Sequence, residues 1–230
     1  MTRLKELLNR MLGKRPQPEY EPEMTAAVRR FVRPGWVCAD VGAHTGHFSR
    51  IMAELVGPTG LVVAFEPLPA NVATIQRQAR RWKHGDRIRV ENCAIADGSA
   101  STLPFYHGRG DSNWEWNLLG HDVEGNRTEA RLQVPARSLD QYFPPGSRLD
   151  FVKMDIEGAE VLALPGMRRL LREARPTVII EFHGEAGWAA RKEFFEQGYR
   201  LCTMDGRVYD PSRDTHRLYH GLVQPTEAPL

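Results

Sequence analysis

Cysteine and long hydrophobic runs are both scarce in this sequence. The chain of 230 residues holds three cysteines, Cys38, Cys93 and Cys202, an odd number that lie far apart. Such spacing offers neither a disulfide framework nor a zinc cluster, so we predict buried free thiols. No apolar run approaches the roughly 18 residues of a membrane span, and the N-terminus lacks the apolar core of a signal peptide. We therefore expect a cytoplasmic protein with no transmembrane segment.

An excess of charge of one sign is also missing. Lysine and arginine total 31 against 29 acidic residues, which gives a formal net charge of +2. This balance lacks the basic footprint typical of nucleic-acid binding, so we expect no nucleic-acid partner. The hydrophobic fraction of 41% and the charged fraction of 26% are typical of one globular domain.

The sequence predicts three parts along the chain. Residues 1–33 form an N-terminal helical extension, whose first segment is basic and amphipathic and ends at Pro16. That segment suits either docking to a membrane or partner or packing back on its own domain. Residues 34–224 form the main domain, and residues 225–230 form a flexible tail.

From Trp36 onward, buried strand patterns alternate with helical patterns, which indicates an α/β domain with a parallel sheet. The interval 107–129 shows no clear period and is rich in Gly, Asp, Asn and Trp, so we expect a loop insertion there. The expected strands cover residues 36–41, 61–65, 88–90, 102–106, 131–134, 150–156, 177–182, 199–204 and 218–223, and the expected helices cover residues 48–55, 70–82, 138–142, 159–171 and 188–197.

The first expected strand ends in a glycine turn with the sequence Asp40-Val41-Gly42-Ala43-His44-Thr45-Gly46. Glycine allows the backbone to approach a ligand closely where a Cβ would clash. The turn lacks the G-x-G-x-x-G pattern that binds the pyrophosphate of a dinucleotide. An acidic residue before the glycines suits a zwitterionic sulfonium ligand and repels a pyrophosphate, which disfavours an NAD-dependent oxidoreductase.

The second expected strand ends at Glu66, about 20 residues after the glycine turn. A carboxylate at this place can accept hydrogen bonds from both hydroxyls of a ribose. Folds that bind NAD and folds that bind S-adenosylmethionine both place an acidic residue there, so Glu66 predicts an adenosyl cofactor of either kind.

Several segments together resemble the FkbM methyltransferase family, over roughly residues 36 to 183. The stretch from Lys153 to Glu160 is the most specific of them, whereas the glycine turn is shared with many methyltransferases. The matching segments are Asp40 to Ser49, Val63 to Pro67, Asn92 to Asp97, Arg137 to Asp140, Asp150 to Glu160 and Pro176 to Glu181.

The resemblance implies a Rossmann-like class I methyltransferase, with a mostly parallel seven-stranded sheet and helices on both faces. It implies S-adenosylmethionine as cofactor and O-methylation of a hydroxyl on a small molecule or sugar-containing metabolite. His44 stands where the family usually has Asn, which adds a titratable group near the sulfonium. Carried over by position, the cofactor contacts are Asp40, Gly42, His44, Gly46, Glu66, Pro67, Asn92, Cys93, Ala94 and Asp155.

Acidic and histidine side chains follow two later strands. Asp155 follows one strand, and Glu181 and His183 follow the next, so parallel pairing brings them to one edge of the sheet. Methyl transfer to a hydroxyl needs alignment and a base, and these three residues are the candidate catalytic bases. Asp155 and Glu181 also suit a Mg²⁺ ion. Glu157 equally suits a cap on the following helix.

The interval 107–129 mixes stacking and hydrogen-bonding side chains, which suits recognition of an acceptor. The candidate substrate residues are Asn113, Trp114, Trp116 and His121. Exposed tryptophans equally suit a homodimer contact. Two further readings stay open: a cofactor-binding protein without catalysis, and a methyltransferase for a macromolecular acceptor, to which the basic N-terminal segment would bind.

Overall fold

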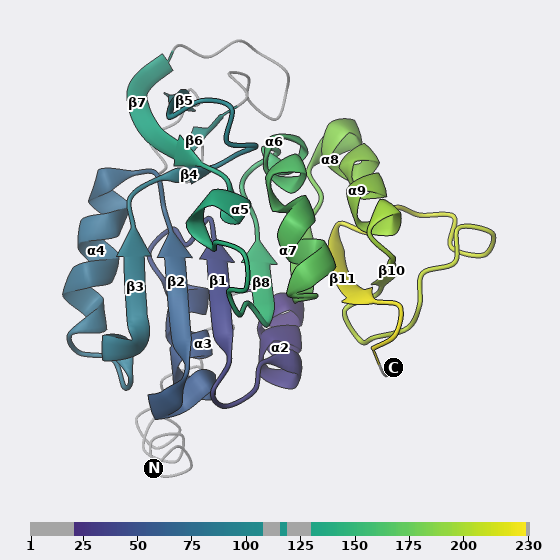
Figure 1. Cartoon of the computed structure of the whole chain (residues 1–230), viewed down its shortest axis with the longest axis horizontal. Coiled ribbons are helices and arrows are strands. Elements are labelled where there is room, and N and C mark those ends of the chain that lie inside the picture. The colour runs from purple at the N-terminus through teal and green to yellow at the C-terminus, as the bar shows by residue number, and fades with distance from the viewer. Residues whose placement is uncertain (1–20, 108–115, 119–129, 229–230) are drawn as a thin grey trace, which may run out of the picture.

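The protein is described here by a computed structural model that covers residues 21–107, 116–118 and 130–228 (Figure 1). The predicted amphipathic segment before Pro16 lies outside the described residues. Among the helices that are described, none is both long and apolar enough to cross a membrane.

A seven-stranded sheet forms the centre of the fold, with the order β10-β11-β9-β8-β1-β2-β3. β11 pairs antiparallel with both β9 and β10, and the other neighbouring strands pair parallel, so the predicted mostly parallel sheet is confirmed. The strands are β1 (Val37–Val41), β2 (Leu61–Phe65), β3 (Ile88–Glu91), β8 (Phe151–Met154), β9 (Thr177–Glu181), β10 (Tyr199–Cys202) and β11 (His220–Pro225).

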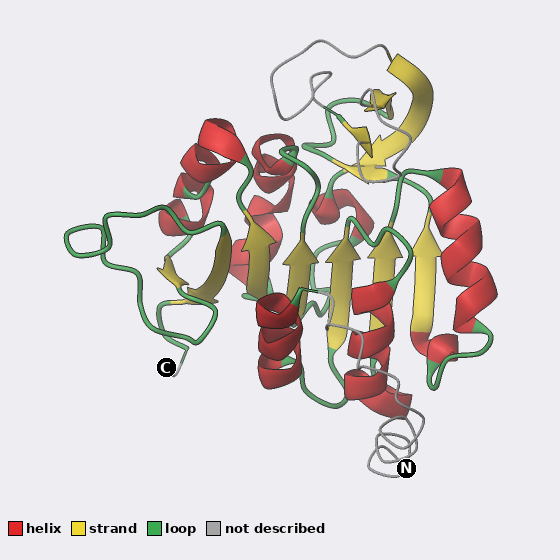
Figure 2. Cartoon of the chain, turned by 180° about the vertical axis from the view of Figure 1, so that it is seen from behind, coloured by secondary structure: helices red, strands yellow, loops and turns green. Residues whose placement is uncertain are grey.

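Helices cover both faces of this sheet (Figures 1 and 2). α2 (Pro22–Phe31), α3 (His47–Val56) and α4 (Pro69–Ala79) lie on one face. α5 (Leu139–Tyr142), α6 (Glu160–Ala163), α7 (Arg168–Glu173), α8 (Gly184–Ala190) and α9 (Lys192–Glu196) lie on the other. Successive strand residues alternate between the faces, because side chains of a strand point in opposite directions.

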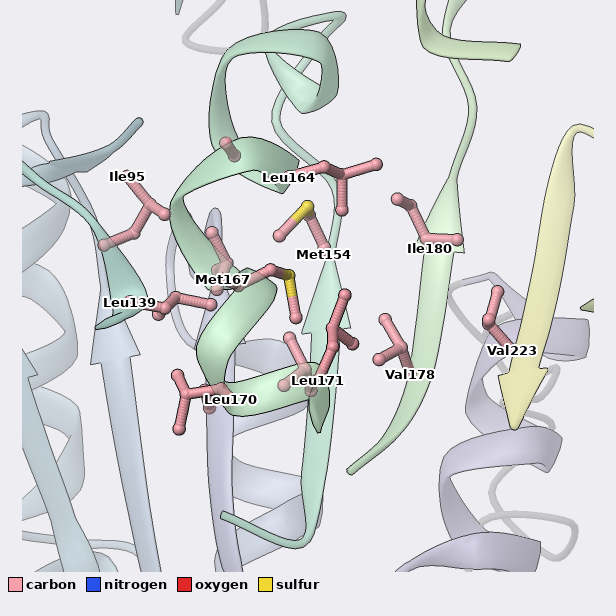
Figure 3. Close-up of a cluster of buried hydrophobic side chains, with 14 of the residues drawn as sticks. Ile95, Leu139, Met154, Leu164, Met167, Leu170, Leu171, Val178, Ile180 and Val223 are labelled. Carbon is pink, nitrogen blue, oxygen red and sulfur yellow. The ribbon is translucent and has the colours of Figure 1, made fainter. Parts of the chain in front are cut away.

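The larger hydrophobic core lies on the α5–α9 face. Figure 3 shows Leu164, Met167 and Leu171 packed over Met154, Val178 and their neighbours on the central strands. The smaller core places Cys38 and Cys202 with residues of α2 and α3. All three cysteines are buried free thiols, as predicted.

Two predicted helices are interrupted. The helix expected over residues 159–171 is divided into α6, a 3₁₀ turn (Leu164–Met167) and α7. Pro165 lacks the N–H that would continue the helix. Gly166 lies so close to the next segment that a Cβ there would be 2.3 Å from the carbonyl oxygen of Ala96. The helix expected over residues 188–197 begins earlier, at Gly184, and consists of α8 and α9.

A small second sheet lies beyond the carboxyl ends of the central strands (Figure 1). Its order is β4-β7-β5-β6, from β4 (Ala94–Ile95), β7 (Ala130–Arg137), β5 (Thr102–His107) and β6 (Trp116–Asn117). Phe105 and Val134 of this sheet pack on Leu68, which follows β2. The second sheet therefore stands over the edge where the predicted site residues meet.

The main domain begins earlier and ends later than predicted. Met24 and Val28 of α2 are fully buried in the α3-side core, so α2 belongs to the domain and not to a separate extension. At the other end, Pro225 is part of β11, and Glu227 forms an ion pair of 2.6 Å with Arg175. Residues 225–228 are therefore attached to the domain, in contrast to the predicted flexible tail.

Met24→Ala is expected to lower the free energy of unfolding by about 2–5 kcal/mol, because it leaves a cavity in place of a fully buried side chain. Ala26→Ser, at an exposed position of the same helix, should change stability by less than about 0.5 kcal/mol. Chemical denaturation of both variants measures this. Equal stability of the two variants would mean that α2 is not part of the core.

Candidate active site

A cavity of about 340 Å³ opens at the carboxyl edge of the central sheet. This volume lies in the range of small-molecule sites, roughly 300–1,000 Å³. Of the predicted cofactor residues, Gly42, His44, Glu66, Pro67, Cys93, Ala94 and Asp155 line it. Lining residues that were not predicted are Val41, Ala43, Thr45, His47, Phe48, Phe65, Asn71, Ile95, Phe105, Leu118, Lys153, Ile156 and Glu157.

The glycine turn after β1 forms one wall of the cavity. Gly42 has a φ of +80°, and a Cβ there would lie 1.9 Å from the carbonyl oxygen of Asp155. Only glycine therefore permits the ends of β1 and β8 to meet. Gly46 does not line the cavity but is the N-cap residue just before α3, with a φ of +87°. Burial and the nearby Lys153 lower the pKa of His44, which keeps this imidazole neutral at neutral pH.

Asp40 lies beneath the turn and does not line the cavity. Its side chain is fully buried, and Ser49 Oγ donates a hydrogen bond of 2.5 Å to its Oδ2. Burial raises the pKa of Asp40, while Lys153 and Ser49 oppose that change. Asp40 therefore stabilises the glycine turn from the protein interior and does not contact a ligand in the cavity.

Lys153 contacts Gly42, Asp155 and Asp40. The sequence did not lead us to predict it as a site residue. Its Nζ donates to the carbonyl oxygen of Gly42 at 3.3 Å and to Asp155 Oδ2 at 3.2 Å, and lies 3.9 Å from Asp40 Oδ1. Burial opposes the charged form, but Asp155 and Asp40 outweigh it and raise the pKa of Lys153. A buried cation therefore holds two carboxylates at the ends of neighbouring strands.

Glu66 is buried at the end of β2 and faces the cavity. Its Oε2 accepts a hydrogen bond from the backbone N–H of His44 at 2.7 Å. Its Oε1 accepts from Leu68 N at 2.9 Å and from Asn71 Nδ2 at 3.3 Å. Each carboxylate oxygen has two lone-pair sites, so Oε2 keeps capacity for another donor. Burial raises the pKa of Glu66 to about 7, against the effect of these hydrogen bonds.

Asn92 does not line the cavity, but its side chain stabilises the wall that contains Glu66 and Pro67. Its Nδ2 donates to the carbonyl oxygens of Glu66 and Pro67, each at 2.9 Å. The predicted cofactor residue therefore connects the segments after β2 and β3, and Cys93 and Ala94 supply the lining of the cavity there.

The turn after β8 brings Asp155 and Glu157 to the opposite wall. Glu157 has a φ of 53° and Gly158 a φ of 92°, both left-handed. Fully buried Glu160 holds this turn, because its Oε1 accepts from Ile156 N at 3.4 Å and Gly158 N at 3.3 Å. α6 begins only at Glu160 and has no side-chain cap, so Glu157 lines the cavity and does not cap a helix. Burial and Asp155 raise the pKa of Glu157 to about 7, whereas His183 opposes this.

Glu181 and His183 lie behind the cavity wall. His183 Nδ1 is 3.0 Å from Glu160 Oε1, and its Nε2 is 3.0 Å from Glu181 Oε1. Burial opposes the charged imidazolium, but these hydrogen bonds outweigh burial and raise the pKa of His183 to about 11. Although burial acts the other way, hydrogen bonds from His183 and His220 hold the pKa of Glu181 well below its usual range. Neither group is suited to accept a proton near neutral pH.

The predicted metal pair is not brought into one ligand group. Among the described residues, Asp155 can share an ion with Glu157 and His183, whereas Glu181 lies in another group with Glu21 and His220. We therefore assign no ion to the predicted pair.

Most of the predicted substrate residues lie outside the described part of the chain. This holds for Asn113, Trp114, His121 and the side chain of Trp116. Among the described residues, Phe105 of the second sheet and Leu118, which follows β6, line the cavity and contribute apolar side chains to the site.

Comparison with known proteins identifies the family of the chain. The FkbM methyltransferase domain matches residues 40–201, from the glycine turn to β10. The chain belongs to the FkbM methyltransferase family. This FkbM protein is 25% identical to methyltransferase sdnD of Sordaria araneosa, over 76% of this chain and 74% of that protein. It is 26% identical to methyltransferase 1 of Beauveria bassiana, over 68% and 69% of the two chains.

Solved structures share the fold of this methyltransferase. The FkbM methyltransferase from Methylobacillus flagellatus KT superposes with a TM-score of 0.52 at 19% identity, over 87% of this chain. The match spans only 50% of that longer chain. A SAM-dependent O-methyltransferase from Thermotoga maritima gives a TM-score of 0.52 at 13% identity, over 96% of this chain and 71% of that one. The family match confirms the predicted family, these two structures confirm the predicted class I fold, and the chain is a methyltransferase.

Proposed function

We propose that this FkbM methyltransferase transfers the methyl group of S-adenosylmethionine to a hydroxyl of a small molecule or sugar-containing metabolite. The observation that carries the proposal is one cavity bordered by buried Glu66 on the β2 side and by Asp155 and Glu157 on the β8 side. The first carboxylate suits the ribose of the cofactor, and the other two suit the acceptor hydroxyl.

The lining of the cavity fits the proposed cofactor. Glu66 Oε2 retains a lone pair for a ribose hydroxyl. The start of α3 at His47 presents backbone N–H groups and a positive helix end, which favour the cofactor's carboxylate. Cys93 and Ile95, together with Phe105 of the second sheet, supply an apolar surface for the adenine. When bound, S-adenosylmethionine supplies an electrophilic methyl group on its sulfonium sulfur.

Glu157 is the general base that we propose, in place of Glu181 and His183. The acceptor hydroxyl must lose its proton as its oxygen bonds to the methyl carbon, and the C–S electron pair goes to sulfur. A base with a pKa near the working pH serves this step best, and Glu157 lines the cavity with a pKa of about 7. Asp155 is held by Lys153 and would orient the acceptor.

A transfer assay tests the proposal. The purified chain is incubated with methyl-labelled S-adenosylmethionine and a panel of hydroxylated small molecules and sugars, with and without Mg²⁺, and products are separated by mass spectrometry. We expect a methyl ether on a hydroxyl of at least one compound. Binding of S-adenosylhomocysteine without transfer to any compound would support a non-catalytic binding protein. Labelled methyl groups found only on protein or RNA would contradict the proposal that the acceptor is a small molecule.

The affinity for the cofactor is expected to fall as the pH drops below about 7. Protonation of Glu66, whose pKa is raised to about 7, removes an acceptor for the ribose hydroxyls. With that pKa the dissociation constant of S-adenosylhomocysteine should be about tenfold larger at pH 6 than at pH 8. Calorimetric titration measures this, and Glu66→Gln should bind weakly at both values. A wild-type affinity that is constant over this range would show that Glu66 does not contact the ribose as a carboxylate.

A further inference from the structure

Glu157, the proposed base, has a backbone conformation that a glutamate rarely adopts. Its φ of 53° lies in the left-handed region, which costs free energy for any residue with a Cβ. A residue keeps such a conformation only where the surrounding structure fixes it. The groups that fix Glu157 therefore determine how its carboxylate is placed in the cavity wall.

One oxygen of Glu160 fixes the backbone on both sides of Glu157. Glu160 Oε1 accepts a hydrogen bond from Gly158 N at 3.3 Å and from Ile156 N at 3.4 Å. These are the residues that directly follow and directly precede the base. Because Glu160 is fully buried, both bonds form in a medium of low dielectric constant, which strengthens them. A single side chain therefore sets the direction in which Glu157 leaves the backbone.

The same oxygen also places an imidazole beside the carboxylate of the base. His183 directly precedes α8, which lies next to α6 (Figure 1). His183 Nδ1 lies 3.0 Å from Glu160 Oε1. Its Nε2 lies 3.6 Å from Glu157 Oε2 and 3.0 Å from Glu181 Oε1. Glu160 thus fixes the backbone of Glu157 directly and the surroundings of its carboxylate through His183.

The second oxygen of Glu160 bonds to none of the described residues. Burying a carboxylate costs free energy, and a well-packed apolar side chain can replace a buried ionic group without loss of stability. Packing alone therefore gives no reason for a glutamate at this position. The partners of Oε1 all lie beside Glu157, which favours a role in the reaction.

We infer that Glu160 is a positioning residue for methyl transfer, which holds Glu157 at the acceptor hydroxyl through the turn and through His183. The inference rests on the proposed function, because that function makes Glu157 the base. Glu160 is not among the residues that line the cavity, so its effect on the reaction passes through Glu157. A reacting group that is displaced by about 1 Å can lose about 10²-fold in rate.

Glu160→Met and Glu160→Gln test the inference in the full chain, on a panel compound that the wild-type chain methylates. Methionine keeps the size of the side chain but removes the carboxylate oxygens, whereas glutamine keeps an acceptor at the Oε1 position. We expect Glu160→Met to lower kcat by about 10²-fold, with KM for the acceptor and the affinity for S-adenosylhomocysteine nearly unchanged. Glu160→Gln should restore most of kcat. Glu193→Met, at a buried glutamate of α9 that bonds to Arg168, is the matched control and should keep wild-type kcat.

A double-mutant cycle distinguishes positioning from damage to the fold. If Glu160 acts through Glu157, Glu160→Met should change kcat little in the Glu157→Gln background, where the base is already absent. Thermal unfolding shows which variants are folded at the assay temperature. If Glu160→Met does not fold, His183→Phe enters the same cycle with the same expectation. Phenylalanine keeps the ring, whose centre lies 5.7 Å from that of Tyr219, but lacks both nitrogens.

Amide hydrogen exchange gives a readout that needs no acceptor. With S-adenosylhomocysteine bound, the Gly158 amide should exchange slowly in wild type and in Glu160→Gln. In Glu160→Met, which removes its hydrogen-bond acceptor, the same amide should exchange at least about tenfold faster.

The outcomes separate this inference from the proposed function. Wild-type kcat in Glu160→Met, equal losses with and without the Glu157 carboxylate, or equal losses in Glu160→Met and Glu160→Gln would each overturn the inference. If Glu157→Gln keeps wild-type kcat, or if the wild-type chain methylates no compound of the panel, the proposed function fails instead. In that case the exchange of the Gly158 amide still shows whether Glu160 holds the turn.

Discussion

Glu157→Gln is expected to lower kcat by about 10²- to 10⁴-fold, the usual contribution of a general base. Glutamine keeps the size and polarity of the side chain but cannot take the acceptor's proton. At saturating cofactor, where protonation of Glu66 no longer limits binding, wild-type kcat should rise with pH through about 7, as Glu157 loses its proton. The variant should lose this rise.

Binding of S-adenosylhomocysteine is the control for this variant, and it should change little. Asp155→Asn is the matched comparison on the same turn, and we expect it to raise KM for the acceptor and to shift the rise of kcat to lower pH without abolishing it, because Asp155 is one of the groups that raise the pKa of Glu157. A Glu157→Gln enzyme with wild-type kcat and an unchanged pH profile would assign the base to another group.

Lys153→Met is expected to lower the free energy of unfolding by about 3–5 kcal/mol, because it leaves buried carboxylates without their cation. Lys153 and Asp40 are 3% and 0% exposed, so water replaces little of the lost interaction. For a chain of this size each kcal/mol shifts Tm by roughly 2–4 °C, so a fall of about 6–20 °C should appear in thermal unfolding.

Two further variants test whether the loss of stability comes from the broken ion pair or from the substitution of a lysine in general. Asp40→Asn in the Lys153→Met background removes one orphaned charge and should recover part of the loss. Arg50→Met breaks an exposed pair with Glu54 on α3 and should cost about 0.5 kcal/mol or less. If Lys153→Met cost no more than Arg50→Met, Lys153 would not hold the two carboxylates together.

The sheet could be predicted from sequence because its strands are buried apolar runs with clear ends. The strand expected at residues 61–65 agrees with β2 at both ends, since Gly60 precedes it and Glu66 follows it. The family resemblance predicted that Gly42, Glu66 and Asp155 would contact one cofactor. All three line the cavity.

Other features depend on contacts that a sequence pattern does not contain. Glu157 reaches the cavity through a left-handed turn that Glu160 holds from another position, so its interpretation as a helix cap was wrong. The sequence predicted helical structure before residue 34 but not that α2 would pack on a face of the sheet. Lys153 did leave a signal, because a lysine inside the apolar run Phe151–Met154 must find partners when it is buried.

Calorimetric titration with S-adenosylhomocysteine and with NAD, on wild type and on Glu66→Gln, tests the central claim most directly. That claim is that the cavity between Glu66 and Asp155 holds the methyl donor. The account predicts that S-adenosylhomocysteine binds with one site per chain, at least tenfold more weakly in Glu66→Gln, and that NAD does not bind. Binding that is equal in both proteins, or binding of NAD alone, would contradict it.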